Sequence, residues 1–120
     1  MHDRIQFISH QKKRILLVDY SNGAPDEVEK ISRAVPDYVT TEPRGSVLVL
    51  SDFTGASFDR DAIRTIKETA VFDKPYVKKS ALVGGRNLSE ELGQSLEDFS
   101  RREFPIFKSR EEALAWLIEE

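Results

Sequence analysis

The chain has 120 residues, of which 39% are hydrophobic and 32% charged, and a formal net charge of -3 at pH 7. This length and composition predict one folded domain over residues 1–120. The acidic balance argues against a nucleic-acid-binding protein. The absence of cysteine excludes disulfides, thiolate catalysis and cysteine-based zinc sites.

The two histidines, His2 and His10, are too few for a His-rich metal site, so we expect no metal. No apolar run approaches the ~20 residues that a membrane-spanning helix needs. The N-terminal residues also lack the apolar core of a signal peptide. We therefore expect a cytoplasmic protein without a membrane span.

Two apolar stretches open the chain, at residues 5–8 and 14–19. The polar residues 9–13 between them are short enough for a hairpin loop. The first two strands are therefore predicted to pair antiparallel.

The first helix is predicted to begin at Pro25, which two acidic residues follow. Val28, Ile31 and Val35 recur at helical spacing and form its expected buried stripe. Pro36 is expected to end the helix, because proline cannot donate the next backbone hydrogen bond. A polar connection up to residue 44 follows.

Residues 47–50 are continuously apolar and rich in branched side chains, with Gly45 shortly before them and Asp52 after them. So short a run predicts a strand buried on both faces. Such a strand needs a layer on each side, which predicts an α/β fold.

The second helix is expected to be capped by Ser57 or Asp59 and to bury Ile63, Ile66 and Ala70. It should stop at residues 73–75, where a lysine and a proline follow an aspartate.

A buried strand at residues 80–83, a helix opened by Ser89 and a short strand at 104–107 complete the pattern, together with a closing helix. Ser109 and Glu112 match the S-x-x-E capping box at the start of that last helix. The order is β-β-α-β-α-β-α-β-α. It predicts an α/β fold with a mixed, mostly parallel sheet of four to five strands and four helices.

Residues with apolar side chains on the inner faces of these elements form the expected core. They are Leu16, Val18, Ile31, Val47, Val49, Ile63, Ile66, Leu82, Leu92, Leu96, Phe99, Leu114 and Leu117. Trp116 is expected to lie partly buried on the sheet edge or a neighbouring helix. Its competing use is the interface of a homodimer.

Three loops follow apolar strands and precede helices. If the strands are parallel, these loops meet at one rim of the sheet, where ligands of open α/β sheets bind. The candidate rim residues are Asp19, Ser21, Asp52, Thr54, Gly55, Asp59, Asp61, Gly84, Gly85 and Arg86. A phosphate or metal site is one interpretation. Helix capping and tight turns, which use the same residue types, are the interpretation we favour.

The charge at this rim depends on Arg86. A pair between Asp52 and Arg86 would leave the rim nearly neutral and suited to a protein surface, whereas a free Arg86 could hold an anion beside the Gly84-Gly85 backbone. The sequence has no dinucleotide fingerprint, no Walker loop and no Gly-x-Ser-x-Gly elbow. We therefore expect binding rather than catalysis, and no cofactor.

Three stretches resemble a known family. Asp-Phe-Thr-Gly-Ala-Ser-Phe-Asp at 52–59 resembles, with one gap, the Asp-Leu-Ser-Gly-Val-x-x-Ile-Asp-Ser-Ser-Gly stretch of STAS domains, the SpoIIAA-like or anti-sigma-factor-antagonist fold. Residues 107–117 resemble the Phe-x-x-x-x-Glu-Ala-x-x-Trp-Leu ending of the small bacterial STAS/SEC14-like family, and residues 74–84 resemble the same group. The resemblance implies a small cytoplasmic α/β domain. STAS relatives act in partner switching, and SEC14 relatives bind lipids.

One departure from the STAS pattern concerns regulation. Partner-switching members carry a phosphorylatable serine just after the second aspartate, where this chain has Asp59-Arg60-Asp61-Ala62. The phosphorylation switch is therefore in doubt. Asp61 could act as a fixed negative charge, although an acid at a helix start is ordinary capping chemistry.

The leading hypothesis is a non-enzymatic STAS-like regulatory module that binds an unidentified protein through residues 52–61. The alternative is a SEC14-like carrier of a small lipid-like or anionic ligand. An apolar cavity near Leu88, Leu92, Phe99 and Phe104 would favour the carrier. An exposed apolar patch near Phe53 and Phe58 would favour the module.

Overall fold

The computed structural model describes residues 3–84 and 90–119, with the backbone alone for 90–94. The chain forms nine elements in the predicted order. They are β1 (Ile5–His10), β2 (Lys13–Asp19), α1 (Pro25–Val39), β3 (Val47–Asp52), α2 (Arg60–Asp73), β4 (Val77–Val83), α3 (Glu90–Ser100), β5 (Ile106–Phe107) and α4 (Arg110–Leu117).

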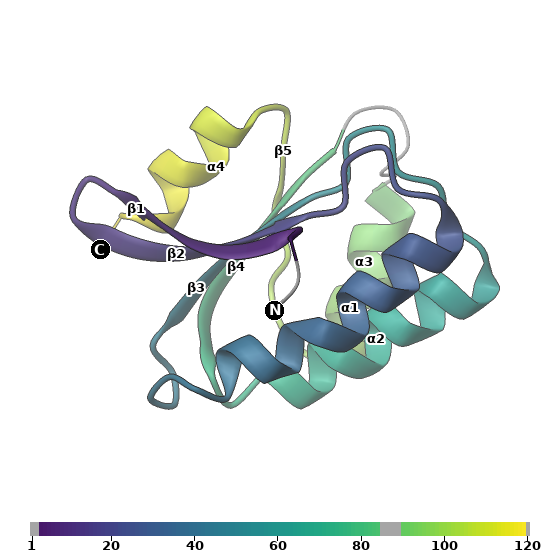
Figure 1. The fold of residues 1–120 in the computed structure, drawn as a ribbon, viewed down its shortest axis with the longest axis horizontal. Coiled ribbons are helices and arrows are strands. Elements are labelled where there is room, and N and C mark those ends of the chain that lie inside the picture. Colours follow the sequence, from purple (N-terminus) through teal and green to yellow (C-terminus); the bar gives the residue numbers. More distant parts are fainter. Residues whose placement is uncertain (1–2, 85–89, 120) are drawn as a thin grey trace.

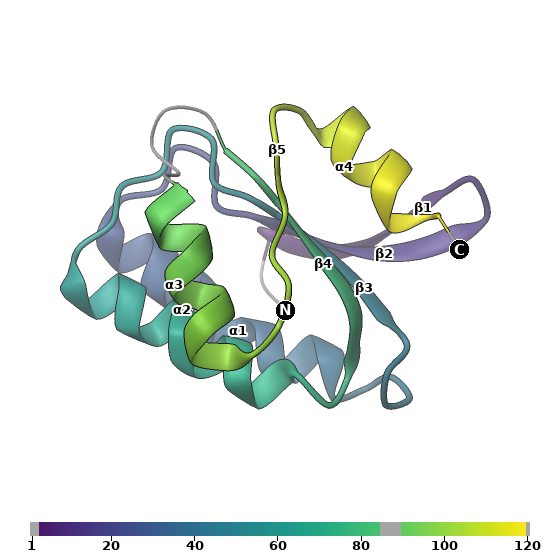
Figure 2. The ribbon, with the colours of Figure 1, turned by 180° about the vertical axis from the view of Figure 1, so that it is seen from behind.

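The predicted fold class is confirmed: the five strands form one sheet in the order β1-β2-β3-β4-β5. β1 runs antiparallel to β2, and the later neighbours are parallel. Among the described helices, α1, α2 and α3 cover one face of the sheet and α4 covers the other (Figure 1). The view from behind shows the same two layers, with α3 and β5 nearest the viewer (Figure 2). Parallel connections of this kind place the carboxyl ends of β2, β3, β4 and β5 at one rim, while the antiparallel β1 begins there.

The hairpin between β1 and β2 is tighter than predicted. The five-residue loop expected at 9–13 is wrong, because pairing continues to His10 and Lys13. Only Gln11 and Lys12 remain in the loop, with φ of 49° and 70°. Positive φ at both central residues is the geometry of a type I′ turn, whose twist matches that of the strands it joins.

The end of α1 is also a correction, because Pro36 lies inside the helix, which continues to Val39. Val39 is fully buried in the core beneath the helix layer. This burial compensates for the hydrogen bond that a proline cannot donate. The helix then closes through the Thr40 amide and hydroxyl, which both donate to the Pro36 carbonyl, at 3.1 and 2.8 Å.

Two apolar clusters fill the space on either side of the sheet. The core prediction is confirmed for Leu16, Val18, Ile31, Val47, Val49, Ile66, Leu82, Leu96 and Leu117, which are all buried.

Three members of the predicted core are less buried than expected. Ile63 and Leu114 are half-buried. Phe99 is 55% exposed, since it lies on the outer side of α3 under the Lys67 ammonium, 5.9 Å from the ring centre. The side chain of Leu92 lies outside the described residues.

Two predicted helix caps are present. The Asp59 carboxylate accepts the Ala62 amide at 2.8 Å, so Asp59 rather than Ser57 caps α2. The Ser109 hydroxyl accepts the Glu112 amide at 3.2 Å and caps α4. Between these two residues, both described, no bond from the Ser109 amide to the Glu112 side chain is present, so only half of the predicted capping box forms.

We expect Ser109→Ala to lower the free energy of unfolding by about 1 kcal/mol, because it removes this cap. Urea denaturation followed by circular dichroism measures the change. Ser57→Ala is the matched control, because Ser57 is exposed and caps no helix. Equal effects of the two substitutions would contradict the capping role of Ser109.

Trp116 lies on the sheet edge as predicted. It is half-buried, with its ring centre 5.7 Å from that of Phe107 and 4.5 Å from the Lys79 ammonium. The same ammonium donates to the Trp116 carbonyl at 2.8 Å. Trp116 therefore packs α4 against β4 and β5.

Candidate functional site

The loops after β2 and β3 meet beside the end of β4, whereas the predicted meeting with the loop after β4 falls on residues 85–89, outside the described residues. Asp19 and Asp52 are register partners at the ends of β2 and β3. The ladder continues into the loops, where the Tyr20 amide donates to the Asp52 carbonyl at 2.8 Å and the Phe53 amide to the Val83 carbonyl at 2.7 Å. This end of the sheet, built from the residues that follow β2 and β3, is called the rim below.

The rim contains the same turn twice. The Asp19 carboxylate accepts the amide and the hydroxyl of Ser21, at 3.0 and 2.5 Å. The Asp52 carboxylate accepts the amide and hydroxyl of Thr54, at 2.9 and 2.6 Å. Each aspartate thus closes a tight turn at the end of its own strand. This is the turn interpretation that we favoured from the sequence.

The residues in the middle of the two turns are aromatic and buried. Tyr20 and Phe53 stack with ring centres 4.3 Å apart and planes 9° from parallel. Phe58 packs on Phe53 at 5.4 Å and is itself half-buried. The exposed apolar patch suggested for Phe53 and Phe58 is therefore wrong, because stacking turns these rings into the core.

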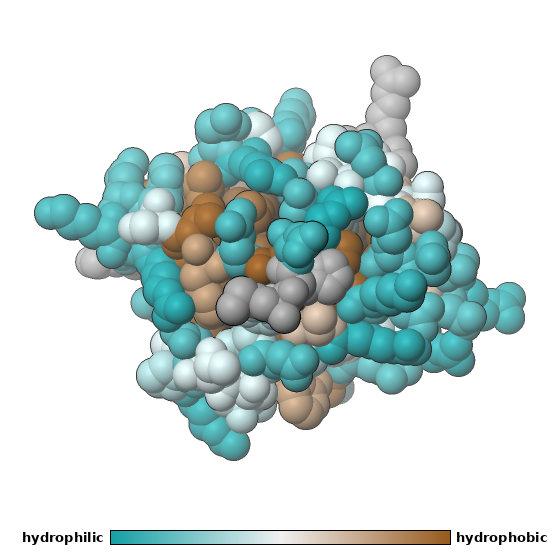
Figure 3. All heavy atoms as spheres, in the orientation of Figure 1, coloured by the Kyte–Doolittle hydropathy of each residue, from teal (hydrophilic) through white to brown (hydrophobic). Residues whose placement is uncertain are grey.

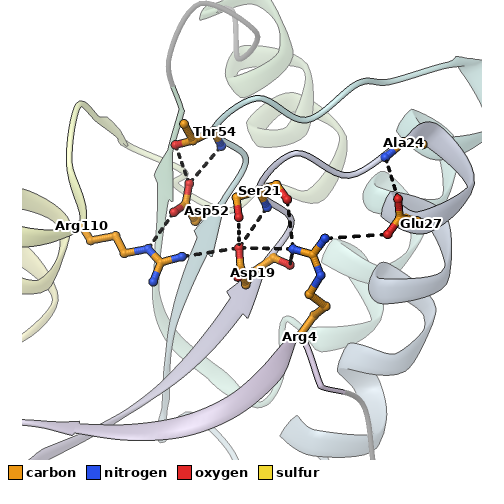
Figure 4. Close-up of polar contacts among 8 residues, drawn as sticks. All are labelled: Arg4, Asp19, Ser21, Ala24, Glu27, Asp52, Thr54 and Arg110. Carbon is orange, nitrogen blue, oxygen red and sulfur yellow. Dashed lines mark hydrogen bonds and ion pairs between the residues drawn. The ribbon is translucent and has the colours of Figure 1, made fainter.

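Two arginines neutralise the aspartates. Arg110, at the start of α4, donates to the Asp52 carboxylate at 2.7 Å and lies 3.4 Å from the Asp19 carboxylate. Arg4, just before β1, lies 3.6 Å from the Asp19 carboxylate and donates to the Ser21 carbonyl at 3.0 Å. The four charged groups form a continuous network across the rim (Figure 4).

Neither arginine was predicted from the sequence. The expected partner of Asp52 was Arg86, but Gly85 and Arg86 lie outside the described residues, and the described partner is Arg110. Two signals were available. The start of β1 lies beside the end of β2 in an antiparallel hairpin, which brings Arg4 to the rim. The helix after a last parallel strand begins at the same rim, which brings Arg110 there.

The network sets the protonation state of Asp52. The Asp52 side chain is only 8% exposed, and this burial by itself would raise its pKa. The hydrogen bonds from Thr54 and Arg110, together with the Arg110 charge, outweigh burial and lower the pKa below its usual value of 3.8. Asp52 is therefore ionised at neutral pH and is not suited to act as a general acid or base.

We expect Arg110→Ala to lower the free energy of unfolding by about 2 kcal/mol at pH 7, because the buried Asp52 carboxylate loses a charged partner. The cost should shrink as the pH falls through the lowered pKa of Asp52, since a protonated carboxyl needs no cation. Urea denaturation at pH 7 and pH 3 tests both statements. Arg60→Ala, an exposed arginine at the start of α2, is the control. A cost that is equal at both pH values would contradict the role assigned to Asp52.

The loop from the rim to α2 is exposed but held by its backbone. The Asn22 amide donates to the Thr54 carbonyl at 2.8 Å, and the Ser57 amide to the Gly23 carbonyl at 2.9 Å. Gly55 has φ of +72°, and a Cβ there would come within 2.3 Å of the Asn22 side chain. The positive φ therefore favours glycine at 55, and a larger residue would also displace the Asn22 side chain.

Three further candidate residues are described, two at the start of α2 and one after β4. Asp59 is used as the α2 cap, and Asp61 pairs with Arg64 one turn along the exposed side of α2. Gly84 follows β4 at the rim and donates to the Phe107 carbonyl at 3.4 Å. Within residues 3–84 and 90–119, no cluster of His, Asp and Glu side chains is suited to hold a metal ion. No helix in these ranges is long and apolar enough to cross a membrane.

The similarity of this chain to known proteins lies in its fold. No protein-family model and no curated protein matches the chain. Among solved structures, the chain is similar to an uncharacterised protein of the DUF3478 family with a SpoIIAA-like fold from Shewanella loihica PV-4. The TM-score is 0.74 at 19% identity, over 94% of this chain and 91% of that one. The chain therefore has the SpoIIAA-like (STAS) fold that its sequence resemblance predicted.

Proposed function

We propose that the chain is a non-catalytic STAS-like regulatory module that binds a protein partner through residues 52–61, which we call the contact segment. The observation that carries the proposal is the combination of exposure and order in this segment. Thr54, Gly55, Ser57 and the residues from 59 to 61 are exposed. The backbone of the segment is bonded to the neighbouring loop at Thr54 and Ser57, and it enters α2 at residue 60. A pre-ordered surface loses little conformational entropy when a partner binds.

The electrostatics of the rim support binding rather than turnover. Asp19 and Asp52 are matched by Arg4 and Arg110, so the rim offers no unpaired carboxylate to a substrate. The lowered pKa of Asp52 makes this carboxylate a weak base, which is unsuited to take a proton from a substrate.

The start of α2 suggests how this module differs from a phosphorylation switch. Asp61 lies in the first turn of α2, near the place where partner-switching STAS domains carry a serine. Its side chain is 60% exposed and paired only with the equally exposed Arg64. We infer that the module binds its partner constitutively, with Asp61 contributing a permanent charge that phosphorylation cannot modulate.

The cavity that the carrier alternative expected under α3 is too small for a small-molecule ligand. This cavity lies between the sheet and the helices, beside Leu96 and Phe104, and its volume is about 50 Å³. Small-molecule sites usually have about 300 Å³ or more. The lining also includes the polar side chains of Asp73, Ser80 and Arg102, which do not suit a lipid chain.

Site-specific crosslinking tests the proposal. A photo-crosslinking amino acid replaces Ser57 in the contact segment or, as a control, the exposed Lys78 at the opposite end of the sheet. Irradiation in an extract of the source cells should give a discrete protein adduct at position 57 and none at 78. Thr54→Arg should abolish that adduct, because it places a bulky cation in the middle of the segment.

Two results would contradict the proposal. One is that the crosslinker gives the same protein adducts at position 57 and at position 78, which would indicate non-specific contact. The other is native mass spectrometry of the purified chain showing a retained small molecule, with no protein adduct at position 57. That result would favour the carrier.

A further inference from the structure

The two edges of the sheet differ in how they are protected from pairing with another strand. At the β4 edge, β5 pairs only with Leu82 and Val83. The rest of this edge lies beside a basic surface pocket to which Lys74, Lys78 and Lys79 contribute. Lysine along an open edge is a common protection, because pairing would bury its charge.

The β1 edge has no such protection. Its six residues, Ile-Gln-Phe-Ile-Ser-His, include no lysine, arginine, acid or proline, and its register with β2 is regular, without a bulge. No strand in the described ranges lies on its outer side. Figure 3, in the orientation of Figure 1, looks onto this edge, and hydrophobic surface is visible over β1 within a hydrophilic surround.

The hairpin geometry determines which backbone groups face outward. The residue pair that flanks a two-residue turn is hydrogen-bonded, and such pairs alternate along the ladder. Here the flanking pair is His10 with Lys13, and the Arg4 carbonyl accepts the Asp19 amide at 2.8 Å. Even-numbered residues of β1 therefore bond to β2, while Ile5, Phe7 and Ser9 direct their amides and carbonyls to the open edge.

We propose that two copies of the chain pair antiparallel through β1, with Phe7 of one copy opposite Phe7 of the other, to form one continuous sheet. In this register Ile5 of each copy lies opposite Ser9 of its mate, and all outward amides and carbonyls gain partners. A two-fold axis places the residue at the centre of the strand opposite the same residue of the other copy. A charge there would meet an identical charge, so a neutral strand is what self-pairing requires.

The surroundings of β1 fit a second copy as well. A groove of about 750 Å³ runs between β1 and α1, with Phe7, Ala34 and Tyr38 in its lining. An axis perpendicular to the sheet keeps both α1 helices on the same face, so the two grooves meet and close each other. The charge of Arg14, whose guanidinium stacks 3.8 Å from the Phe7 ring centre, is paired with Glu42.

Sedimentation of the full chain over a dilution series tests the proposal. The wild type should dimerise, and Ser9→Pro should raise the dissociation constant of the dimer at least ~10-fold. Ser9 is exposed and its amide faces outward, so the proline removes no bond within one copy. Ser9→Lys should weaken the dimer in the same direction. Ser46→Lys, the matched control at an exposed serine outside β1 and the contact segment, should leave it unchanged. Circular dichroism confirms that each variant is folded.

Hydrogen exchange provides a second readout of the same interface. The amides of Phe7 and Ser9 should be protected in the dimer and lose protection on dilution, while those of Ile8 and His10 stay protected throughout. A chain that is monomeric at every concentration would overturn the proposal. So would a dimer that Ser9→Pro leaves intact, or one in which the Phe7 and Ser9 amides exchange freely.

Discussion

Leu50→Ala is expected to lower the free energy of unfolding by about 3 kcal/mol, within the ~2–5 kcal/mol typical of such truncations in a packed core. Leu50 is fully buried in the central strand β3, on the face that α4 covers. One helix of eight residues, α4, is the cover on this side. The lost methyl groups therefore leave a cavity that no second helix can move in to fill.

Urea denaturation of the wild type and the variant measures this loss. Leu114→Ala is the matched control, because it makes the same truncation at a half-buried position on α4. Its cost should be clearly smaller, since less apolar surface is removed from a buried environment. A Leu50→Ala cost no larger than that of Leu114→Ala would contradict the assignment of β3 as the central, two-sided strand.

Asp73→Asn is expected to change the pH dependence of stability. Asp73 ends α2, is 5% exposed, and its Oδ1 atom has no hydrogen-bond partner among the described residues. Burial raises the pKa of Asp73 from 3.8 to about 7, and the charge of Arg102 opposes this only in part. The Arg102 guanidinium is itself engaged with the Ala70 carbonyl at 2.7 Å and with the Ser80 hydroxyl.

The sign of the effect follows from proton binding. Between pH 3.8 and about 7 the folded chain keeps a proton on Asp73 that the unfolded chain releases. Stability due to this group therefore falls as the pH rises through that window, by up to about 4 kcal/mol. Asparagine does not titrate, so Asp73→Asn should match the wild type near pH 4 and exceed it by about 2–4 kcal/mol at pH 8.

Denaturation at a series of pH values from acid to pH 8 gives the difference between the two chains. Glu68→Gln, an exposed change on the same helix, should follow the wild type at every pH. If Asp73→Asn also tracks the wild type, Asp73 is ionised in the folded state and the raised pKa is wrong.

The sequence by itself determined the order of elements, the central strand and the two helix caps. These features have local causes: Asp59 and Ser109 bond to amides three residues away, and the run at 47–50 is apolar without interruption. The convergence of Asp19 and Asp52 also followed, because parallel strands end at the same side of a sheet.

Only the tertiary structure decided which charges neutralise these aspartates. Arg110 lies 58 positions from Asp52, and no local pattern couples the two. The same holds for Phe53, whose neighbours suggest an exposed loop but whose ring is buried by stacking on Tyr20. Pro36 is the reverse case: the local rule ends the helix there, and burial of Val39 outweighs the missing hydrogen bond. Packing energy is summed over contacts between residues that are distant in sequence. It can therefore outweigh a local conformational preference of a few kcal/mol, such as the preference of proline to end a helix.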